Sequence, residues 1–186
     1  FTRFANTQIG HEAPMWLPNE SAKLDYEGEL AVVIGKSGRR IPEENALDHV
    51  FGYSCYNDGS IRDWQRHTSQ FTPGKNFPGT GAFGPWLVTA DEISDPSSLA
   101  LTTRLNGKEM QSATTDMMIF TIPKLINYIS TFTRLEPGDV IVSGTPGGVG
   151  SRRDPPIFMQ PGDRVEVEIS GIGTLGNPIQ LESSTA

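Results

Sequence analysis

The chain has 186 residues, of which 36% are hydrophobic and 20% are charged, so it is long enough to bury a core within one domain. Its formal net charge is −7, it has no run of Lys or Arg, and no apolar segment approaches the roughly 20 residues of a membrane span, which argues against a nucleic-acid partner or a membrane location. The single cysteine, Cys55, excludes an internal disulfide and favours a reducing, cytoplasmic compartment.

The 20 glycines and 14 prolines indicate many turns, and they favour β structure with loops over a helical bundle. Residues 1–19 are expected to be irregular, because Pro14 and Pro18 interrupt them. The sequence opens at Phe1 rather than Met, so we expect that an N-terminal part of the natural protein is absent from it.

Residues 24–35 have the apolar density and the β-branched run of a strand. Because side chains alternate between the faces of a strand, Asp25, Glu27 and Glu29 share one face, and the two glutamates lie roughly 6–7 Å apart at the backbone. Two such carboxylates repel each other unless positive charge lies between them, and a hard divalent cation is a natural candidate.

The alternative interpretation is that Glu27 and Glu29 form the solvated face of an amphipathic strand, as Glu166 and Glu168 are expected to do. The apolar run at residues 30–34 distinguishes the two pairs, because it is typical of a strand buried on both faces. A carboxylate pair on a buried strand needs compensation, which favours the cation site.

The segment that follows offers a third carboxylate. Residues 42–51 are expected to begin with an acidic helical turn, residues 52–57 to form a strand, and residues 60–65 to form a short helix or turn. Asp58 lies at the end of this strand, where a side chain can enter the rim of a pocket. Three carboxylates with open positions suit Mg²⁺ or Mn²⁺ and do not suit zinc, which prefers His and Cys.

A loop rich in Gly and Pro is expected at residues 71–85 and contains Lys75. A lysine fixed between Pro and Gly can supply positive charge to an anionic substrate or a developing oxyanion, whereas the alternative is an ordinary solvated lysine. Residues 79–84 match a dinucleotide-binding fingerprint, but no strand precedes them and a strand-like run at 86–88 follows, so we reject that interpretation.

The second half of the chain carries clear local signals. Asn106 and Gly107 predict a hairpin between residues 101–105 and 108–111. A helix is expected at 121–132, with Thr121 as its cap, and strands at 140–143 and 165–169. The glycine-rich residues 144–150 follow a strand directly, so they either present backbone N–H groups and the Thr145 hydroxyl to an anion or form an ordinary turn.

We therefore expect one domain over residues 1–186, in which strands dominate and helices are few and short. His11, His49 and His67 are scattered, and each is more simply explained as an ordinary histidine than as a catalytic one. His11 is the least ordinary of the three, because Glu12 follows it and the pair precedes the acidic strand.

These segments together resemble the fumarylacetoacetate hydrolase family, in particular the C-terminal catalytic domain shared by its smaller members. The resemblance covers nearly the whole chain in the right order, through residues 24–35, 53–65, 74–77, 101–110 and 143–150. It implies an α+β, mostly β fold with a rolled mixed sheet, described as a β-sandwich roll, and a homodimer.

The resemblance also implies the roles of individual residues. Glu27, Glu29 and Asp58 would bind one Mg²⁺ or Mn²⁺ ion. Lys75 would contact the substrate oxyanion, Thr145 would hold the substrate carboxylate, and Arg62 and Gln65 would line the pocket. Family hydrolases activate water with a His that is often paired with a Glu on a lid upstream of the acidic strand. The candidates are His11 and Glu12, or a lid in the N-terminal part that we expect to be absent from this sequence.

The leading functional expectation is a divalent-metal-dependent hydrolase that cleaves a C–C bond in an acylpyruvate or diketo acid through a metal-stabilised enolate. The alternatives are a decarboxylase or isomerase of 2-oxo acids, such as oxaloacetate or intermediates of aromatic catabolism, and a non-catalytic domain that retains the fold. Only hydrolysis needs a base positioned to activate water, so the metal site does not choose among these reactions.

Overall fold

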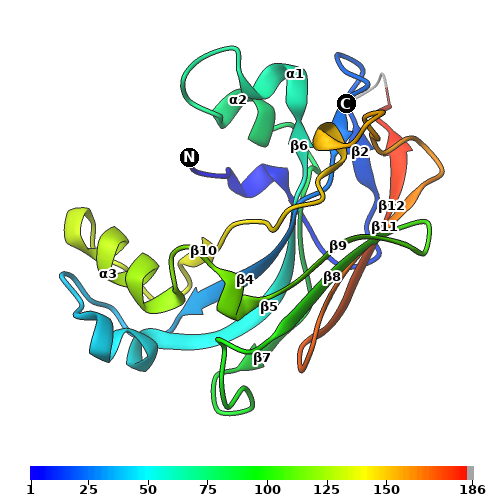
Figure 1. Cartoon of the computed structure of the whole chain (residues 1–186). Helices are drawn as coiled ribbons and strands as arrows, with labels where there is room; N and C mark the ends of the chain where they lie inside the picture. Colours follow the sequence, from blue (N-terminus) through cyan, green and yellow to red (C-terminus); the bar gives the residue numbers. More distant parts are fainter. Residues whose placement is uncertain (184–186) are drawn as a thin grey trace.

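Two curled sheets form the body of the protein (Figure 1), and the computed structural model describes residues 1–183. The first sheet has the strand order β1 (Gln8–Ile9), β7 (Gly81–Thr89), β5 (Val50–Asp58), β4 (Gly28–Ile34) and β10 (Val140–Val142). The second has the order β2 (Met15–Leu17), β12 (Gly173–Leu181), β11 (Arg164–Ile169), β8 (Ala100–Leu105) and β9 (Lys108–Thr114). A short ladder joins β3 (Leu24–Asp25) to β6 (Ser60–Ile61). The β1–β7 and β12–β2 pairs are parallel and the others are antiparallel, so both large sheets are mixed.

The helices are few and short. The α-helices are α1 (Arg62–Gln65), α2 (Thr72–Lys75) and α3 (Ile122–Phe132), and 3-10 helices lie at Ala5–Thr7, Glu43–His49, Thr115–Met117 and Gly150–Arg152. Helix α3 packs beside the Glu43–His49 helix at one edge of the molecule, whereas α1 and α2 lie together at another (Figure 1). No helix in the described chain is both long enough and apolar enough to cross a membrane. The predicted mostly-β α+β fold is confirmed.

The core lies between the curled sheets. Strand β11 alternates as predicted, with Val165, Val167 and Ile169 almost fully buried and the intervening charged residues partly exposed. Strand β4 is buried at every position, which confirms that it has no solvated face. Burying each large apolar side chain of this kind contributes about 1.5–3 kcal/mol, so the apolar residues of these strands hold the two sheets together.

The acidic segment differs from the single strand predicted over residues 24–35. It is divided into β3 and β4, and the break lies at Tyr26 and Glu27. The Tyr26 N–H donates to Asp25 Oδ1 at 2.9 Å, and the Glu27 N–H donates to Asn57 Oδ1 at 3.0 Å. Side-chain acceptors thus replace the strand partners at this point, which is the physical reason for the break.

Other boundaries also depart from the sequence expectations. The helix expected over residues 42–51 ends at His49, because Val50 pairs with Ile34 and begins β5. The loop expected at 71–85 contains α2 and the first half of β7. Strands β1, β2 and β12 were not predicted, because two are only two or three residues long and the third contains glycines and a proline.

The local signals of the second half are confirmed. Strands β8 and β9 form the predicted hairpin, and Asn106 (φ 52°) and Gly107 (φ 77°) both have the positive φ that a type I′ turn requires. Helix α3 begins after Thr121, whose hydroxyl accepts a hydrogen bond from the Lys124 N–H at 3.4 Å. The chain between the hairpin and β10 therefore has the predicted order of elements.

Candidate metal centre

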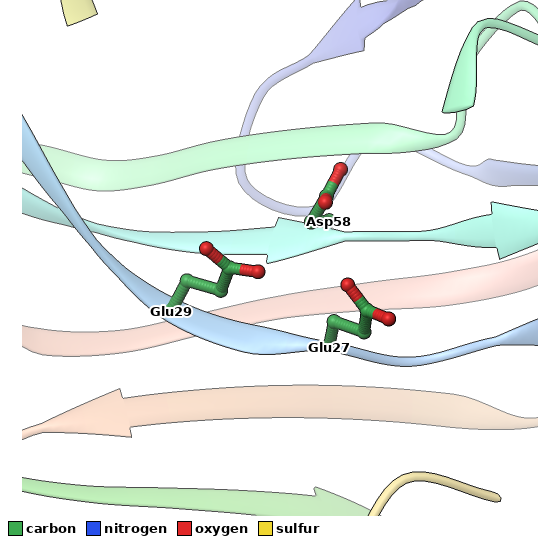
Figure 2. A group of neighbouring side chains, drawn as sticks. All are labelled: Glu27, Glu29 and Asp58. Carbon is green, nitrogen blue, oxygen red and sulfur yellow. The ribbon is translucent and has the colours of Figure 1, made fainter. Parts of the chain in front are cut away.

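Three buried carboxylates converge where β4 and β5 lie side by side. Glu27 immediately precedes β4, Glu29 is its second residue, and Asp58 ends β5. One oxygen from each of the three lies within 4.8 Å of the others, and all three residues are buried. Figure 2 shows the two glutamates rising from one segment while the Asp58 carboxylate lies beside them from the neighbouring strand. The antiparallel register, in which Gly28 opposes Asn57, brings them together.

Only glycine fits between the two glutamates. A Cβ atom built at Gly28 would lie 2.1 Å from Thr103 Oγ1 of β8 and 3.3 Å from a methyl carbon of Val167. The acidic segment therefore packs against the second sheet with its backbone, and the flanking glutamate side chains are directed to the other side, where Asp58 lies.

Three cationic side chains surround the cluster. Lys75 Nζ lies 2.7 Å from Glu27 Oε2 and 2.6 Å from Asp58 Oδ2. Lys75 is only 2% exposed, so the interpretation of Lys75 as an ordinary solvated loop lysine is wrong. Arg3 Nη1 lies 2.6 Å from Asp58 Oδ1. Removing one partner of a buried ion pair costs about 3–5 kcal/mol, so these cations hold the carboxylates in place.

Arg62, the third cation, joins the cluster to a fourth carboxylate. Its Nη1 lies 2.6 Å from Glu27 Oε1, and its Nε lies 2.8 Å from Asp25 Oδ2. Asp25 is fully buried and also accepts hydrogen bonds from the backbone N–H groups of Gly150 and Ser151, both at 2.8 Å. The break in the acidic segment turns Asp25 away from the metal-binding group that Glu27 and Glu29 form, and toward the loop after β10.

Glu29 differs from the other carboxylates, because no Lys, Arg or His of residues 1–183 forms an ion pair with it. Its Oε2 accepts a hydrogen bond from the Gly144 N–H at 2.5 Å. Burial raises the pKa of Glu29 well above its ordinary value, and the negative charges of Asp58 and Glu27 raise this pKa further. The cluster is therefore short of positive charge at Glu29, and its all-oxygen ligands fit a hard divalent cation such as Mg²⁺ or Mn²⁺.

A pocket of about 480 Å³ opens beside Glu27. The structure brings several predicted site residues to its wall, together with two arginines that the sequence did not single out: Glu27, Arg62, Gln65, Thr145, Arg66 and Arg152. Arg66 and Arg152 are exposed, and neither forms an ion pair with another described residue. The pocket is therefore lined by one carboxylate of the cluster, Glu27, and by two arginines whose charge no described carboxylate neutralises.

The Thr145 hydroxyl is already hydrogen-bonded within the protein. It donates to the Gly28 carbonyl at 2.9 Å and accepts from Gln111 Nε2 at 2.8 Å. Because a hydroxyl has one proton, Thr145 has no hydroxyl donor left for a ligand. A substrate carboxylate at Thr145 would have to accept from the backbone of the loop instead.

His11 and Glu12 are placed elsewhere, so their expected role as water-activating residues is contradicted by the geometry. His11 Nδ1 accepts from the Gly176 N–H at 3.0 Å, and Glu12 Oε1 lies 2.5 Å from Arg164 Nη2. The Arg164 guanidinium holds the pKa of Glu12 below its ordinary value. Both residues thus contact β11 and β12, and neither contacts the three carboxylates.

The sequence did not single out Arg3 or Gln111, and it did not indicate that Asp25 accepts hydrogen bonds from the backbone N–H groups of the loop. Arg3 lies in a segment with no periodic pattern, 55 residues from the Asp58 that it contacts. The sequence signal that could have indicated Arg3 was the excess of acidic residues around position 27, because buried carboxylates need more than one compensating cation.

Comparison with known proteins gives consistent matches along the chain. The family model described as fumarylacetoacetate (FAA) hydrolase C-terminal matches residues 1–180. Oxaloacetate tautomerase YisK of Bacillus subtilis (strain 168) is 47% identical over 180 residues, which are 96% of this chain and 60% of that protein. Mitochondrial oxaloacetate tautomerase fahd2 of Xenopus laevis is 45% identical over 181 residues, which are 96% of this chain and 57% of that protein. The chain thus spans less than two thirds of the length of these relatives.

Solved structures agree with the sequence matches. A fumarylacetoacetate hydrolase from Exiguobacterium antarcticum superimposes with a TM-score of 0.94 at 42% identity, covering 98% of this chain and 66% of that one. A 2-hydroxyhepta-2,4-diene-1,7-dioate isomerase from Mycobacterium marinum gives a TM-score of 0.88 at 37% identity, covering 96% of this chain and 67% of that one. The matched proteins include both hydrolases and isomerases by name.

Proposed function

The chain belongs to the fumarylacetoacetate hydrolase family, and from this membership we propose that it interconverts the keto and enol forms of a 2-oxo dicarboxylate such as oxaloacetate. Both curated relatives described above are named oxaloacetate tautomerases. The expectation of a divalent-metal enzyme that acts on a 2-oxo acid is retained, and the expected reaction changes from C–C hydrolysis to isomerisation.

The observation that carries the proposal is the distribution of charge around the pocket. Glu27 belongs to the three-carboxylate cluster at one side, whereas Arg66 and Arg152 lie on the wall without ion-pair partners in the described chain. Oxaloacetate has a 2-oxo acid group at one end and a second carboxylate at the other. The first group suits a hard cation held by the cluster, and the second suits an arginine.

Glu27, Glu29 and Asp58 would hold the divalent ion, which supplies a Lewis acid that stabilises negative charge on the oxygen of an enolate. The other groups act on the substrate directly. Enolisation removes one proton from C3 and adds one to the oxygen on C2, so the composition of the substrate is unchanged. We assign Lys75 Nζ to the C2 oxygen, because this ammonium is fixed by two carboxylates and donates a hydrogen bond where charge develops.

The names of the two tautomerase relatives favour isomerisation over hydrolysis. Each reaction needs a base, to accept the C3 proton or to activate water, and His11 and Glu12 supply neither, because they are hydrogen-bonded to Gly176 and Arg164. Hydrolysis of an acylpyruvate is the second candidate, and it is supported by the similarity to the Exiguobacterium antarcticum hydrolase. Decarboxylation of oxaloacetate releases CO₂ and the enolate of pyruvate, which the same ion would stabilise, and it is tested in the same experiment.

The test follows the absorbance of enol oxaloacetate at fixed pH with Mg²⁺ or Mn²⁺, and in parallel the release of pyruvate from oxaloacetate and from acylpyruvates. We expect the protein to accelerate the approach to keto–enol equilibrium and this acceleration to be lost in EDTA. In Glu29→Gln the catalysed rate should fall by at least about 100-fold, because a ligand of the ion is lost. Glu44→Gln, an exposed change outside the cluster, is the matched control. Pyruvate release without faster keto–enol exchange would refute the tautomerase proposal in favour of the other reactions.

We also propose that the chain forms a homodimer. Large apolar side chains are exposed in the segment after β9 and on α3, namely Met117, Ile119, Phe120, Tyr128 and Phe132. Exposed apolar surface of this kind is typical of a protein interface. Light scattering after gel filtration should give twice the chain mass, and Ile119→Glu should give the single-chain mass. A single-chain mass for the unmodified protein would refute this proposal.

A further inference from the structure

Gln111 of β9 is a buried polar residue that joins the metal-ligand segment to the loop at residues 143–150. We propose that Gln111 is a positioning residue, which holds this loop so that the backbone N–H groups of the loop bind the carboxylate of the 2-oxo acid group. The inference rests on the proposed function, because it assigns the carboxylate-binding part of the same pocket. Gln111 does not line the pocket itself, and it is only 2% exposed.

All hydrogen-bonding atoms of the Gln111 amide have partners. Its Oε1 accepts from the Gly28 N–H at 3.0 Å, and Gly28 lies between the two glutamates of the cluster. Its Nε2 donates to Thr145 Oγ1 at 2.8 Å and to the Pro146 carbonyl at 2.9 Å. The two amide protons are both used, so the orientation of the amide is fixed by its surroundings. One side chain thus connects the acidic segment to two consecutive residues of the pocket wall.

The Thr145 hydroxyl completes the link, because it accepts from Gln111 and donates to the Gly28 carbonyl at 2.9 Å. Both side chains hold the loop, and neither has a donor left for a ligand. Thr145 and Gly147 line the pocket, and their backbone N–H groups donate to no acceptor within residues 1–183. Such N–H groups form a concave anion site when the loop that carries them is held in place.

The neighbouring residue, Met110, anchors the same loop at a second point. A Cβ atom built at Gly148, which has φ +103°, would lie 2.3 Å from the Met110 carbonyl oxygen. Arg153 Nη2 donates to the same carbonyl at 2.5 Å, and Arg153 Nε donates to the Gly148 carbonyl at 3.2 Å. Because these contacts do not involve the Gln111 amide, its removal is expected to shift residues 145–147 without releasing the whole loop.

The experiment replaces Gln111 by Met, which has a similar length and no amide. We expect KM for oxaloacetate to rise about tenfold, because the two buried hydrogen bonds from Gln111 to the loop are lost. We expect kcat to change less than about threefold and the Mn²⁺ affinity less than about twofold, because the three carboxylates keep their own partners. Gln160→Met, at an exposed position far along the chain, is the control that should leave all three values unchanged.

A readout that needs no turnover is the affinity of the Mn²⁺-loaded protein for oxalate, measured by calorimetry, which should weaken about tenfold in Gln111→Met. In a double-mutant cycle, Gln111→Met should add little to Thr145→Val, since both remove the same link. If Gln111→Met does not fold, Gln111→Leu replaces it, and the thermal transition of each variant is recorded. An active protein whose Gln111 variant keeps its KM and its oxalate affinity, or a fully additive cycle, would overturn the inference. A wild-type protein that binds oxalate but does not isomerise oxaloacetate would instead refute the proposed function alone.

Discussion

Replacement of Glu29 by Gln separates two effects on the free energy of unfolding: the destabilisation by repelling carboxylates in the metal-free cluster, and the stabilisation by metal binding. Glu29 is 4% exposed, it has no cationic partner among the described residues, and its pKa is raised by burial and by two neighbouring carboxylates. Glutamine keeps the size of the side chain and an oxygen that accepts from the Gly144 N–H, but it removes the charge. The variant is therefore expected to be more stable than wild type in EDTA at neutral pH.

The sign of the pH dependence follows from the raised pKa. Between the pKa of the unfolded chain, about 4.3, and the higher pKa in the folded protein, the folded state binds the additional proton. The contribution of Glu29 to stability is fully present below the unfolded pKa and is lost as the pH rises through the folded pKa. Glu29→Gln should therefore be more stable than wild type at neutral pH and lose this advantage in acid.

In the presence of metal, wild type is expected to be more stable than Glu29→Gln. At a Mn²⁺ concentration about 100 times its dissociation constant, wild type should gain about 2.7 kcal/mol, because the ion binds the folded state only. Glu29→Gln should gain much less, since a charged ligand of the ion is missing. Urea unfolding of both proteins, in EDTA and in Mn²⁺, between about pH 5 and pH 8, measures each quantity.

Two results would refute this reasoning about Glu29. An equal gain from Mn²⁺ in both proteins would show that Glu29 does not bind the ion. A metal-free variant that is less stable than wild type at every pH would show that the carboxylate is not short of positive charge. Glu44→Gln, at an exposed position, should match wild type in EDTA and in Mn²⁺ at every pH measured.

Three further predictions concern the groups around the cluster. Lys75→Met should lower kcat/KM for oxaloacetate by about 100-fold or more, because it removes the proposed donor to the enolate oxygen, as steady-state kinetics would show. It should also lower the free energy of unfolding by about 3–5 kcal/mol, because two buried carboxylates lose their ion-pair partner, as urea unfolding would show. Changing both Arg66 and Arg152 to Gln should raise KM for oxaloacetate about tenfold and leave the affinity for pyruvate, which has one carboxylate, nearly unchanged; equal losses for both ligands would contradict the assignment. Gly28→Ala should destabilise the protein by about 1–3 kcal/mol through its contact with Thr103, and Thr103→Ala should restore part of this loss in the double variant, as thermal unfolding would show.

The sequence predicted the three carboxylates because their placement depends on local rules. Alternation along a strand directs Glu27 and Glu29 to one side, and the apolar segment before Asp58 predicted a strand that ends there, which the structure pairs with β4. The three side chains lie together even though residues 26 and 27 interrupt the expected strand, because Glu27 is adjacent to β4 and still directs its side chain to the same side as Glu29. Asp25 lies before the break, and its predicted position was therefore wrong.

The compensating groups could not be predicted in this way. Arg3 and Gln111 contact the acidic cluster and its segment across 55 and 83 residues of sequence, and Arg153 contacts Tyr26 of the same segment across 127. None of them belongs to a periodic pattern, and each lies in a segment whose local structure is explained without the site. The wrong expectation for His11 has the same cause. Its proximity in sequence to the acidic strand favoured it as the water-activating residue, whereas the fold places it against β12.

The balance of charge gives the site a preferred order of binding. Four buried or nearly buried carboxylates, Asp25, Glu27, Glu29 and Asp58, face the three cations Lys75, Arg62 and Arg3. With all four carboxylates ionised, the metal-free cluster is negative by one charge and repels a dicarboxylate, whereas one divalent cation bound at Glu29 makes it positive by one. Because this reversal occurs in a poorly solvated cluster, oxalate should bind measurably only when Mg²⁺ or Mn²⁺ is present, and calorimetry in EDTA should show no binding. Equal oxalate affinity with and without the ion would mean that the arginines of the wall, and not the cluster, determine the binding of the anion.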